Sequence, residues 1–365
     1  MTPALFDLPL RTGEAAQLAS LIFEHADGKP LNDELRNRLA GRAAQLKMES
    51  IRPYFGSLER DAIHHSTYYL AVDGLESQPL LMHVAPATAP TSALFPQAFL
   101  IGRMQAAGGG RREIVINASP FGPGDSERVL TFAEEVNRTF LPRPQGSRPA
   151  ISVGGDLVRS NLPGIFEAFR FIFKTKGVNV ASVRAPETAA MWAAIRTGWR
   201  EGYTVDAGAL PDKAAIVERA GATRFSFDTS RASDVEKRLS INAELYDFVR
   251  HAKARRRHGR AFDFDLAGFE TAAELLAALN GWKERGRAAQ LVSRLVPMSA
   301  GAFPRLGEIA DIARQFQTTL SINAGDGTDL EMLRRAGEET KGRVDCRIDP
   351  KEPGRIAEVF QTLFA

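Results

Sequence analysis

The stretch that decides the fold is residues 198–230, GWREGYTVDAGALPDKAAIVERAGATRFSFDTS. It contains two consecutive units, in each of which a short strand candidate (YTVDAG, then TRFSFDT) ends in polar residues and is followed by a helical segment. Strands that alternate with helices are typical of α/β proteins with a parallel sheet. The stretch therefore predicts such a sheet, with polar side chains at the carboxyl ends of its strands.

The same pattern continues through the C-terminal part of the chain. Eight strand candidates alternate with helical stretches, at residues 150–156, 179–185, 203–208, 223–229, 260–266, 290–296, 318–324 and 343–349. Eight strands that are each followed by a helix are the signature of a (β/α)8 TIM barrel. The sequence therefore predicts an α/β fold of this class.

The N-terminal part has a different pattern. Residues 14–48 have helical spacing with a break at 28–32, residues 125–140 predict one helix, and strands are expected at 66–73, 80–86 and 113–119. Residues 102–112, with their adjacent glycines, predict a flexible hairpin connection. The Pro- and Gly-rich stretch 141–149 predicts a boundary. We expect a small α+β domain over residues 1–145 and the barrel over residues 146–365.

Length and composition narrow the function classes. A chain of 365 residues with a net charge of only +3 favours two domains and a small-molecule partner over a nucleic acid. A single cysteine excludes an intramolecular disulfide framework and a thiolate zinc site. Neither a secretory signal nor an apolar run of about 20 residues is seen, so we expect a cytoplasmic protein without a membrane partner. The sequence leaves open whether the protein forms a homo-oligomer.

The expected strands separate apolar from polar side chains by parity, and the polar parity should face the lumen of the barrel. It carries five carboxylates and up to three arginines: Asp206, Asp228, Asp263, Asp265, Asp345, Arg184, Arg294 and Arg347. Unpaired buried charges cost several kcal/mol each, about 3–5 when a buried pair is broken. Two interpretations follow: a closed ion-pair network that only sets the barrel geometry, or a ligand site at the carboxyl ends of the strands.

The order of motifs along the chain resembles the tagaturonate epimerase family, metal-dependent (β/α)8 enzymes that interconvert tagaturonate and fructuronate. The similar stretches are AISVGGDLVRSNLPGI at 150–165, EGYTVDAGALPD at 201–212, AGATRFSFDTS at 220–230, DFDLAG at 263–268, VSRLVPM at 292–298, LSINAGDGT at 320–328 and RIDPK at 347–351. The resemblance implies epimerisation or isomerisation of a sugar acid, a ketohexuronate or related polyol, at the mouth of the barrel.

The departures from the family pattern keep a second function open. Ala209 and Asp212 stand where the family has His and Lys, whereas Asp206 and Asp228 match it. The alternative is therefore a catalytically inactive member that serves as a ligand-binding or assembly module.

The candidate site residues follow from the chemistry of a sugar acid. Catalytic proton transfer is expected from Asp206, Asp228 and Asp265 at strand ends. Substrate binding is expected from Arg184, Arg294, Asn323 and Arg347, because a planar guanidinium forms two parallel hydrogen bonds to a carboxylate. No histidine lies at a strand end. Oxygen ligands from Asp228, Asp263 and Asp265 would suit a divalent cation such as Mg²⁺, Mn²⁺ or Ni²⁺.

Overall fold

The computed structural model divides the chain into two compact units. The first comprises Met1–Phe140 and Met191–Arg200, and the second comprises Leu141–Ala190 and Glu201–Ala365. The expected division lay between residues 145 and 146, so the main difference is that residues 191–200 join the first unit. The structure describes residues 11–26, 28–61, 66–73, 78–88, 94–95, 98–105, 113–145, 148–171, 177–181, 187–210, 214, 222–227, 235–251, 261–265, 271–284, 292–298, 306–323 and 330–364.

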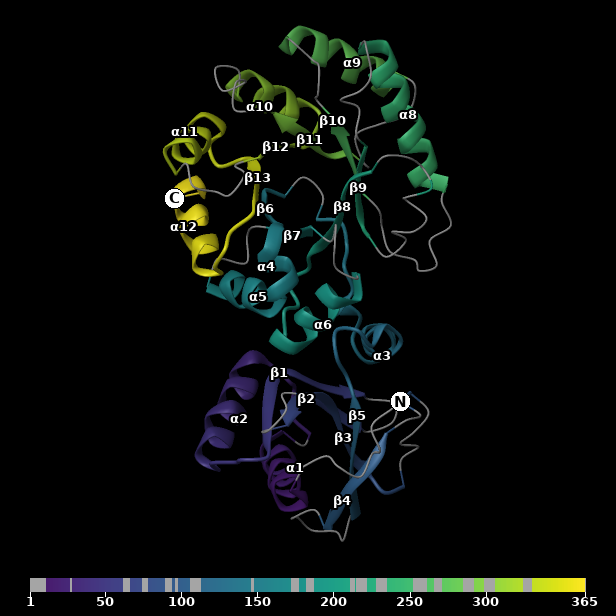
Figure 1. The fold of residues 1–365 in the computed structure, drawn as a ribbon, viewed down its shortest axis with the longest axis vertical. Helices are drawn as coiled ribbons and strands as arrows, with labels where there is room; N and C mark the ends of the chain where they lie inside the picture. The colour runs from purple at the N-terminus through teal and green to yellow at the C-terminus, as the bar shows by residue number, and fades with distance from the viewer. Residues whose placement is uncertain are drawn as a thin grey trace. The chain divides into compact units, whose positions relative to one another are not determined.

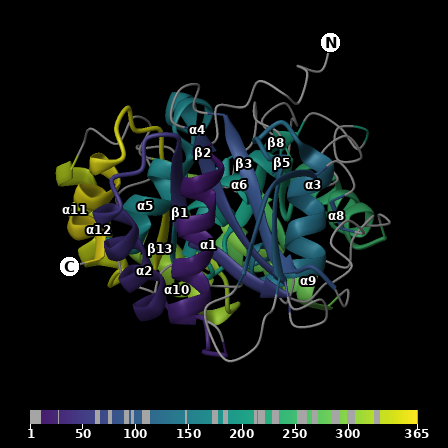
Figure 2. The same cartoon turned by 90° about the horizontal axis from the view of Figure 1, so that it is seen from below.

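The first unit is built on an antiparallel sheet of five strands in the order β1-β2-β3-β5-β4. The strands are β1 (Ile51–Asp61), β2 (Ser66–Asp73), β3 (Pro79–Pro86), β4 (Phe99–Gln105) and β5 (Glu113–Pro120). Two helices, α1 (Thr12–Ala26) and α2 (Asp33–Gln45), pack their buried apolar side chains into the same core as the sheet (Figure 1). Figure 2 shows the same unit from below, with α1 in front of the strands.

Local chemistry explains the break between the two helices. Asn32 is the N-cap of α2, and its side-chain oxygen accepts a hydrogen bond from the backbone N–H of Leu35 at 2.8 Å. Leu35, Leu39 and Ala43 then recur at helical spacing and are buried in the core. The expected pair of helices is confirmed, as are the three expected strands, now β2, β3 and β5.

Two expectations for this unit are corrected, and one strand was missed. Strand β1 was not predicted, and residues 102–105, expected in a flexible connection, belong to β4, which pairs with β5. Residues 125–140 are not one helix: α3 (Ser126–Thr131) passes into a π-helical turn, Phe132–Val136, and a 3-10 turn, Arg138–Phe140. Asn137 interrupts the helix because its backbone is extended and its side-chain oxygen accepts hydrogen bonds from Thr139.

The N-terminus of α1 contains a carboxylate that should make the first unit sensitive to acid. Glu14 accepts hydrogen bonds from the backbone N–H and the hydroxyl of Ser50, each at 2.8 Å, and from the N–H of Glu49 at 3.2 Å. Burial raises the pKa of Glu14, but these hydrogen bonds, from Ser50 first, outweigh it and hold that pKa below the ordinary value of 4.5.

A group with a lowered folded-state pKa stabilises the fold above its unfolded-state pKa, and the contribution is lost as the pH falls through the folded-state value. Glu14→Gln should therefore lower the free energy of unfolding at pH 7 by about 1 kcal/mol or less, because the site is partly solvated. The difference from the parent should shrink as the pH falls below 4.5. Denaturant titrations of the parent and the variant between pH 3 and 7 measure this difference in the free energy of unfolding. Glu24→Gln, an exposed position on the same helix, is the control. A difference that does not change with pH would show that the hydrogen bonds do not lower the pKa of Glu14.

Residues 191–200 belong to the first unit because of specific contacts with β1 and its surroundings. The indole Nε1 of Trp192 donates to the carbonyl of Phe121 at 2.7 Å. Arg196 stacks over the ring of Tyr54, 4.5 Å from its centroid, and donates to the hydroxyl of Tyr54 at 3.1 Å. Gly198 has a φ of 70°, and a Cβ there would collide with the carbonyl of Gly56. Glycine is thus required where this segment meets β1.

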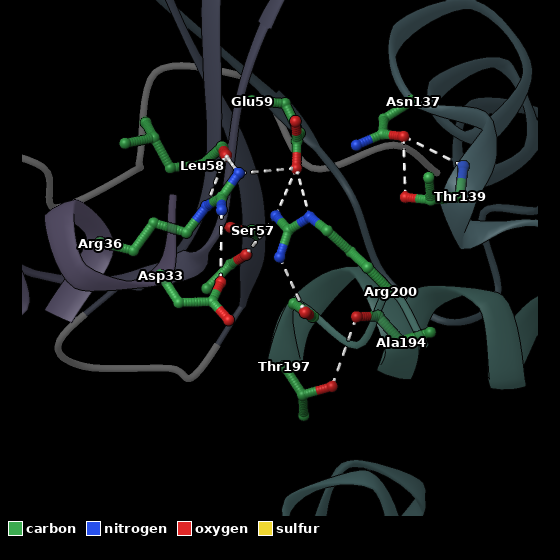
Figure 3. Close-up of polar contacts among 12 residues, drawn as sticks. Asp33, Arg36, Ser57, Leu58, Glu59, Asn137, Thr139, Ala194, Thr197 and Arg200 are labelled. Carbon is green, nitrogen blue, oxygen red and sulfur yellow. Dashed lines mark hydrogen bonds and ion pairs between the residues drawn. The ribbon is translucent and has the colours of Figure 1, made fainter. Parts of the chain in front are cut away.

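A carboxylate between two arginines completes this contact. Figure 3 shows Glu59 of β1 between Arg36 of α2 and Arg200. One carboxylate oxygen of Glu59 accepts from Arg36 Nη2 at 3.3 Å, from Arg200 Nε at 2.9 Å and from Arg200 Nη2. Arg36 also donates to the carbonyl of Leu58 and, through Nη1, to Asp33, and Arg200 also donates to the carbonyls of Gly56 and Gly198. Because these groups satisfy one another, we interpret the cluster as a packing contact within the first unit.

The second unit is built on a closed sheet of eight strands in the order β10-β11-β12-β13-β6-β7-β8-β9, with every neighbouring pair parallel. The strands are β6 (Ala150–Val153), β7 (Gly177–Ala181), β8 (Thr204–Leu210), β9 (Arg224–Phe227), β10 (Ala261–Asp265), β11 (Val292–Met298), β12 (Thr319–Asn323) and β13 (Val344–Ile348). All eight strands that were expected from the sequence are present, with somewhat different ends.

In the described part of the chain, a helix follows seven of these eight strands. After the eighth, β8, residues 211–213 and 215–221 lie outside the described residues. The helices are α4 (Gly155–Ser160), α5 (Leu162–Phe171), α6 (Glu187–Thr197), α8 (Val235–His251), α9 (Ala272–Glu284), α10 (Leu306–Gln315), α11 (Leu330–Thr340) and α12 (Gly354–Phe364). Figure 1 shows α10, α11 and α12 on the outside of the sheet, beside β12 and β13. None of the helices in the described part is both long and apolar enough to cross a membrane.

The apolar parity of the strands packs against these helices. Phe166 of α5 meets Tyr203 edge to face, with the ring centroids 5.2 Å apart, and both rings are fully buried. Buried Leu, Ile, Val and Phe side chains on the strands and helices complete this layer. Each such side chain contributes about 1.5–3 kcal/mol when it is removed from water. The outer layer is therefore the main hydrophobic core of the second unit, which leaves the polar parity for the inside of the sheet.

Candidate functional site

Most of the described polar side chains on the strands of the closed sheet are almost completely buried, as the alternation in the strands predicted. Seven of them expose 3% or less of their surface: Ser152, Thr204, Asp206, Arg224, Thr319, Ser321 and Asp345. A buried polar side chain must find a hydrogen-bond or charge partner inside the protein or in a ligand. The structure shows the protein partners of several of these side chains.

An ion pair crosses the lumen of the sheet. Arg224 Nη2 of β9 lies 3.6 Å from Asp345 Oδ2 of β13. In the closed order, three strands separate β9 from β13 on either side, so the two side chains reach each other across the middle. Arg224 was not among the residues singled out from the sequence, although it has the same parity as Ser226 and Asp228.

This ion pair lies toward the amino ends of the strands. Arg224 is the first residue of β9, and Asp345 Oδ1 accepts a 2.6 Å hydrogen bond from the N–H of Ala150, the first residue of β6. In barrels of parallel strands, reacting groups come from the carboxyl ends, and the amino ends serve stability. The interpretation as a structural ion-pair network therefore applies to Asp345.

Asp206, an expected catalytic residue, accepts a hydrogen bond from the backbone of its own strand. It is 1% exposed, and its Oδ1 accepts a 2.9 Å hydrogen bond from the N–H of Gly208. The β8–β9 register shifts between Asp206 and Ala209, and Gly208 has a φ of 76°. The carbonyl of Gly208 accepts from the hydroxyl of Ser226 at 2.8 Å. The DAG motif thus forms a bulge in β8, in which the carboxylate of Asp206 holds the backbone.

Arg347, an expected substrate-binding residue, lies near the carboxyl end of β13. It shares a parity with Asp345, and its register partners are Asn323, the last residue of β12, and Ser152 of β6. The side chain is half-buried, and its guanidinium makes no hydrogen bond or ion pair with any residue in the described ranges. Unlike Arg224, this arginine is therefore available to a ligand.

Asp349 follows the end of β13 and was not singled out from the sequence. One of its carboxylate oxygens, Oδ1, is buried and accepts no hydrogen bond from the described chain. A Cβ on Gly155, whose φ is 68°, would lie 3.0 Å from the Cβ of Asp349. The hydrogen bond from the N–H of Gly154 to the carbonyl of Ile348, at 2.9 Å, aligns this end of β13 with the end of β6.

For the other expected site residues, the structure gives at most their position on a strand. Asp263 of β10 pairs in register with Arg294 of β11, and Asp265 pairs with Val296, but the side chains of these residues and of Asn323 are not among those described. Asp228 and Arg184 lie outside the described residues. Among the described side chains, no group of three or more His, Cys, Asp or Glu could hold a metal ion. The site of Asp228, Asp263 and Asp265 therefore stays a prediction.

Cys346 and Tyr203 are two further buried titratable groups. Burial, together with the neighbouring carboxylate of Asp345, raises the pKa of the Cys346 thiol well above its ordinary value. Burial likewise raises the pKa of the Tyr203 hydroxyl. Both groups are therefore protonated at neutral pH, and neither is poised as a nucleophile or a base.

No protein-family model and no curated protein matches the sequence. The fold is similar to two solved structures of fructuronate-tagaturonate epimerase UxaE from Cohnella laeviribosi, with one and with two bound glycerols. Each has a TM-score of 0.57 and 14% sequence identity. The match covers 87% of this chain and 74% of the first structure, and 86% and 74% for the second. At this identity the comparison establishes a similarity of fold.

Proposed function

We propose that this chain is a tagaturonate epimerase-like (β/α)8 protein that binds a sugar acid, a ketohexuronate or related polyol acid, at the carboxyl ends of its barrel strands. The closed parallel sheet, the similarity of fold to a fructuronate-tagaturonate epimerase and the order of sequence motifs support it. Arg347 is the observation that carries the proposal: a half-buried guanidinium near these strand ends that bonds to none of the described residues.

The chemistry of the proposed site divides between binding and proton transfer. The guanidinium of Arg347 binds the substrate carboxylate through two parallel hydrogen bonds. Epimerisation requires groups that take up and return a proton, a role proposed for Asp228 and Asp265. Asp206, whose buried carboxylate accepts the N–H of Gly208, would hold the bulge of β8 in place. A divalent cation held by Asp228, Asp263 and Asp265 would polarise a substrate oxygen.

Arg347→Gln should weaken binding of tagaturonate and fructuronate about 10- to 100-fold, because a charge-assisted hydrogen bond contributes about 1.5–3 kcal/mol. Titration calorimetry measures this loss. Arg343→Gln is the matched control, because Arg343 lies just before β13 and is exposed. This variant should bind the two sugar acids as tightly as the parent does. Equal affinities for all three proteins would remove Arg347 from the site.

A second candidate, a catalytically inactive ligand-binding or assembly module, is favoured by Ala209 and Asp212, which stand where the similar family has His and Lys. Nuclear magnetic resonance of tagaturonate incubated with the protein and with Mg²⁺, Mn²⁺ or Ni²⁺ separates the two. Appearance of fructuronate that depends on Asp228 supports the enzyme. Saturable binding without conversion supports the ligand-binding module, and the absence of any binding contradicts both the enzyme and the ligand-binding module.

A further inference from the structure

The end of β13 carries two opposite charges that do not pair with each other. Arg347 and Asp349 are two residues apart, and both are described, yet no ion pair or hydrogen bond joins their side chains. Neighbouring charges elsewhere in this unit do pair, as Arg334 and Glu331 do at 2.6 Å on the surface of α11. The end of β13 thus carries a donor and an acceptor two residues apart in the chain, near the carboxyl ends of the strands.

The carboxylate of Asp349 needs a hydrogen-bond partner more than the guanidinium of Arg347 does. Asp349 Oδ1 is buried and receives no hydrogen bond from the described residues. A buried oxygen without a donor is costly, and nearly all such groups in folded proteins have a partner. Gly155 closes one side of the carboxylate, since a side chain there would press on the Cβ and Cγ of Asp349, at 3.0 and 3.4 Å. A ligand that approaches from another side would supply the missing donor.

A single ligand can satisfy both groups only if it carries an anion and a hydrogen-bond donor. A carboxylate fits Arg347, and a hydroxyl group a few bonds away fits Asp349, because an ionised carboxylate accepts but does not donate. A simple fatty acid has the first group and lacks the second. Water could occupy the same position, but water gives no preference between the two kinds of acid.

We propose that Asp349 is a specificity-determining residue that binds a hydroxyl group of the ligand, so that the site selects polyhydroxy carboxylates over plain carboxylates. This inference rests on the proposed function, because it takes Arg347 as the anchor for the ligand carboxylate.

The test is a titration of the full chain with tagaturonate, fructuronate and hexanoate. The parent should bind the two hexuronates about tenfold more tightly than hexanoate, the effect of one charge-assisted hydrogen bond. Asp349→Ala should weaken hexuronate binding about tenfold and leave hexanoate unchanged. This variant keeps the Cβ that lies beside Gly155, and hydrogen exchange of the peptides around β13 checks that the fold is retained. Asp156→Ala, an exposed carboxylate of the adjacent α4, is the control and should change neither.

The outcomes separate this inference from the proposed function. If Arg347→Gln weakens all three ligands while Asp349→Ala leaves hexuronate binding unchanged, the carboxylate anchor stands and the hydroxyl contact is wrong. The contact is also wrong if Asp349→Ala weakens hexanoate as much as the hexuronates, or if the parent binds all three equally. If no ligand shows binding that depends on Arg347, the proposed function fails and the inference fails with it.

Discussion

Replacing Asp345 with leucine is expected to lower the free energy of unfolding of the second unit by about 3–5 kcal/mol. The carboxylate is fully buried and lies 3.6 Å from Arg224, whose side chain is also buried. Its other oxygen accepts the N–H of Ala150. The substitution removes the opposite charge from beside a buried guanidinium and removes an acceptor from a buried backbone donor, and both losses act in the same direction.

A double variant separates the cost of the unbalanced charge from the cost of the changed shape. Arg224→Met combined with Asp345→Leu replaces the pair by apolar side chains, which often restores or exceeds the original stability. We therefore expect the double variant to be more stable than Asp345→Leu alone. If it is less stable, the two side chains act independently and the lumen ion pair is not a unit.

Hydrogen exchange of peptides from β6, β9 and β13, followed in increasing denaturant, measures this stability in the second unit alone. Asp311→Ala is the matched control, since it breaks an exposed ion pair with Arg314 on α10 in the same unit. Exposed pairs contribute about 0–1 kcal/mol. Equal losses for Asp345→Leu and Asp311→Ala would contradict a buried role for Asp345.

The sequence predicted the strands of the second unit because their polar and apolar residues alternate so regularly. Alternation also placed Asp345 and Arg347 on one side of β13, which the register with β12 and β6 bears out. It could not pair Asp345 with Arg224, because that contact exists only after eight strands have closed and brought β9 opposite β13. Asp349 also lay in the expected strand 343–349, on the same parity as Asp345 and Arg347, but it was not singled out as a site residue; the structure ends β13 one residue before it, at Ile348.

In the first unit, local sequence signals failed where a strand is irregular. Strand β1 contains Pro53 and Gly56, which normally count against a strand, and its register with β2 shifts between Tyr54 and Glu59. The sequence also gave no sign that residues 191–200 belong to the first unit. This membership depends on contacts such as that of Arg200 with Glu59, 141 residues away, and no local pattern reports a contact at that separation.

Glu59 itself should be the most sensitive single position of the first unit. Its carboxylate is the partner shared by Arg36 and Arg200, and the side chains of Glu59 and Arg36 are only 10% and 7% exposed. Burial, and then the charge of Arg200, lower the pKa of Arg36, while Glu59 raises it. Glu59→Leu would leave two like charges facing each other, so we expect a loss of about 3–5 kcal/mol in the free energy of unfolding of this unit.

Tryptophan fluorescence can follow this loss, because Trp192 and Trp199 lie in the segment that Glu59 holds and are 6% and 4% exposed. In the variant, their emission should shift to the red at a lower denaturant concentration than in the parent. Glu34→Leu, which breaks the exposed pair with Arg38 on α2, should cost less than about 1 kcal/mol. Glu59→Gln keeps the shape and an acceptor but removes the charge, so it should fall between the two. If Glu59→Leu and Glu34→Leu lose the same amount, the two arginines are held by backbone carbonyls alone, and the carboxylate between them is dispensable.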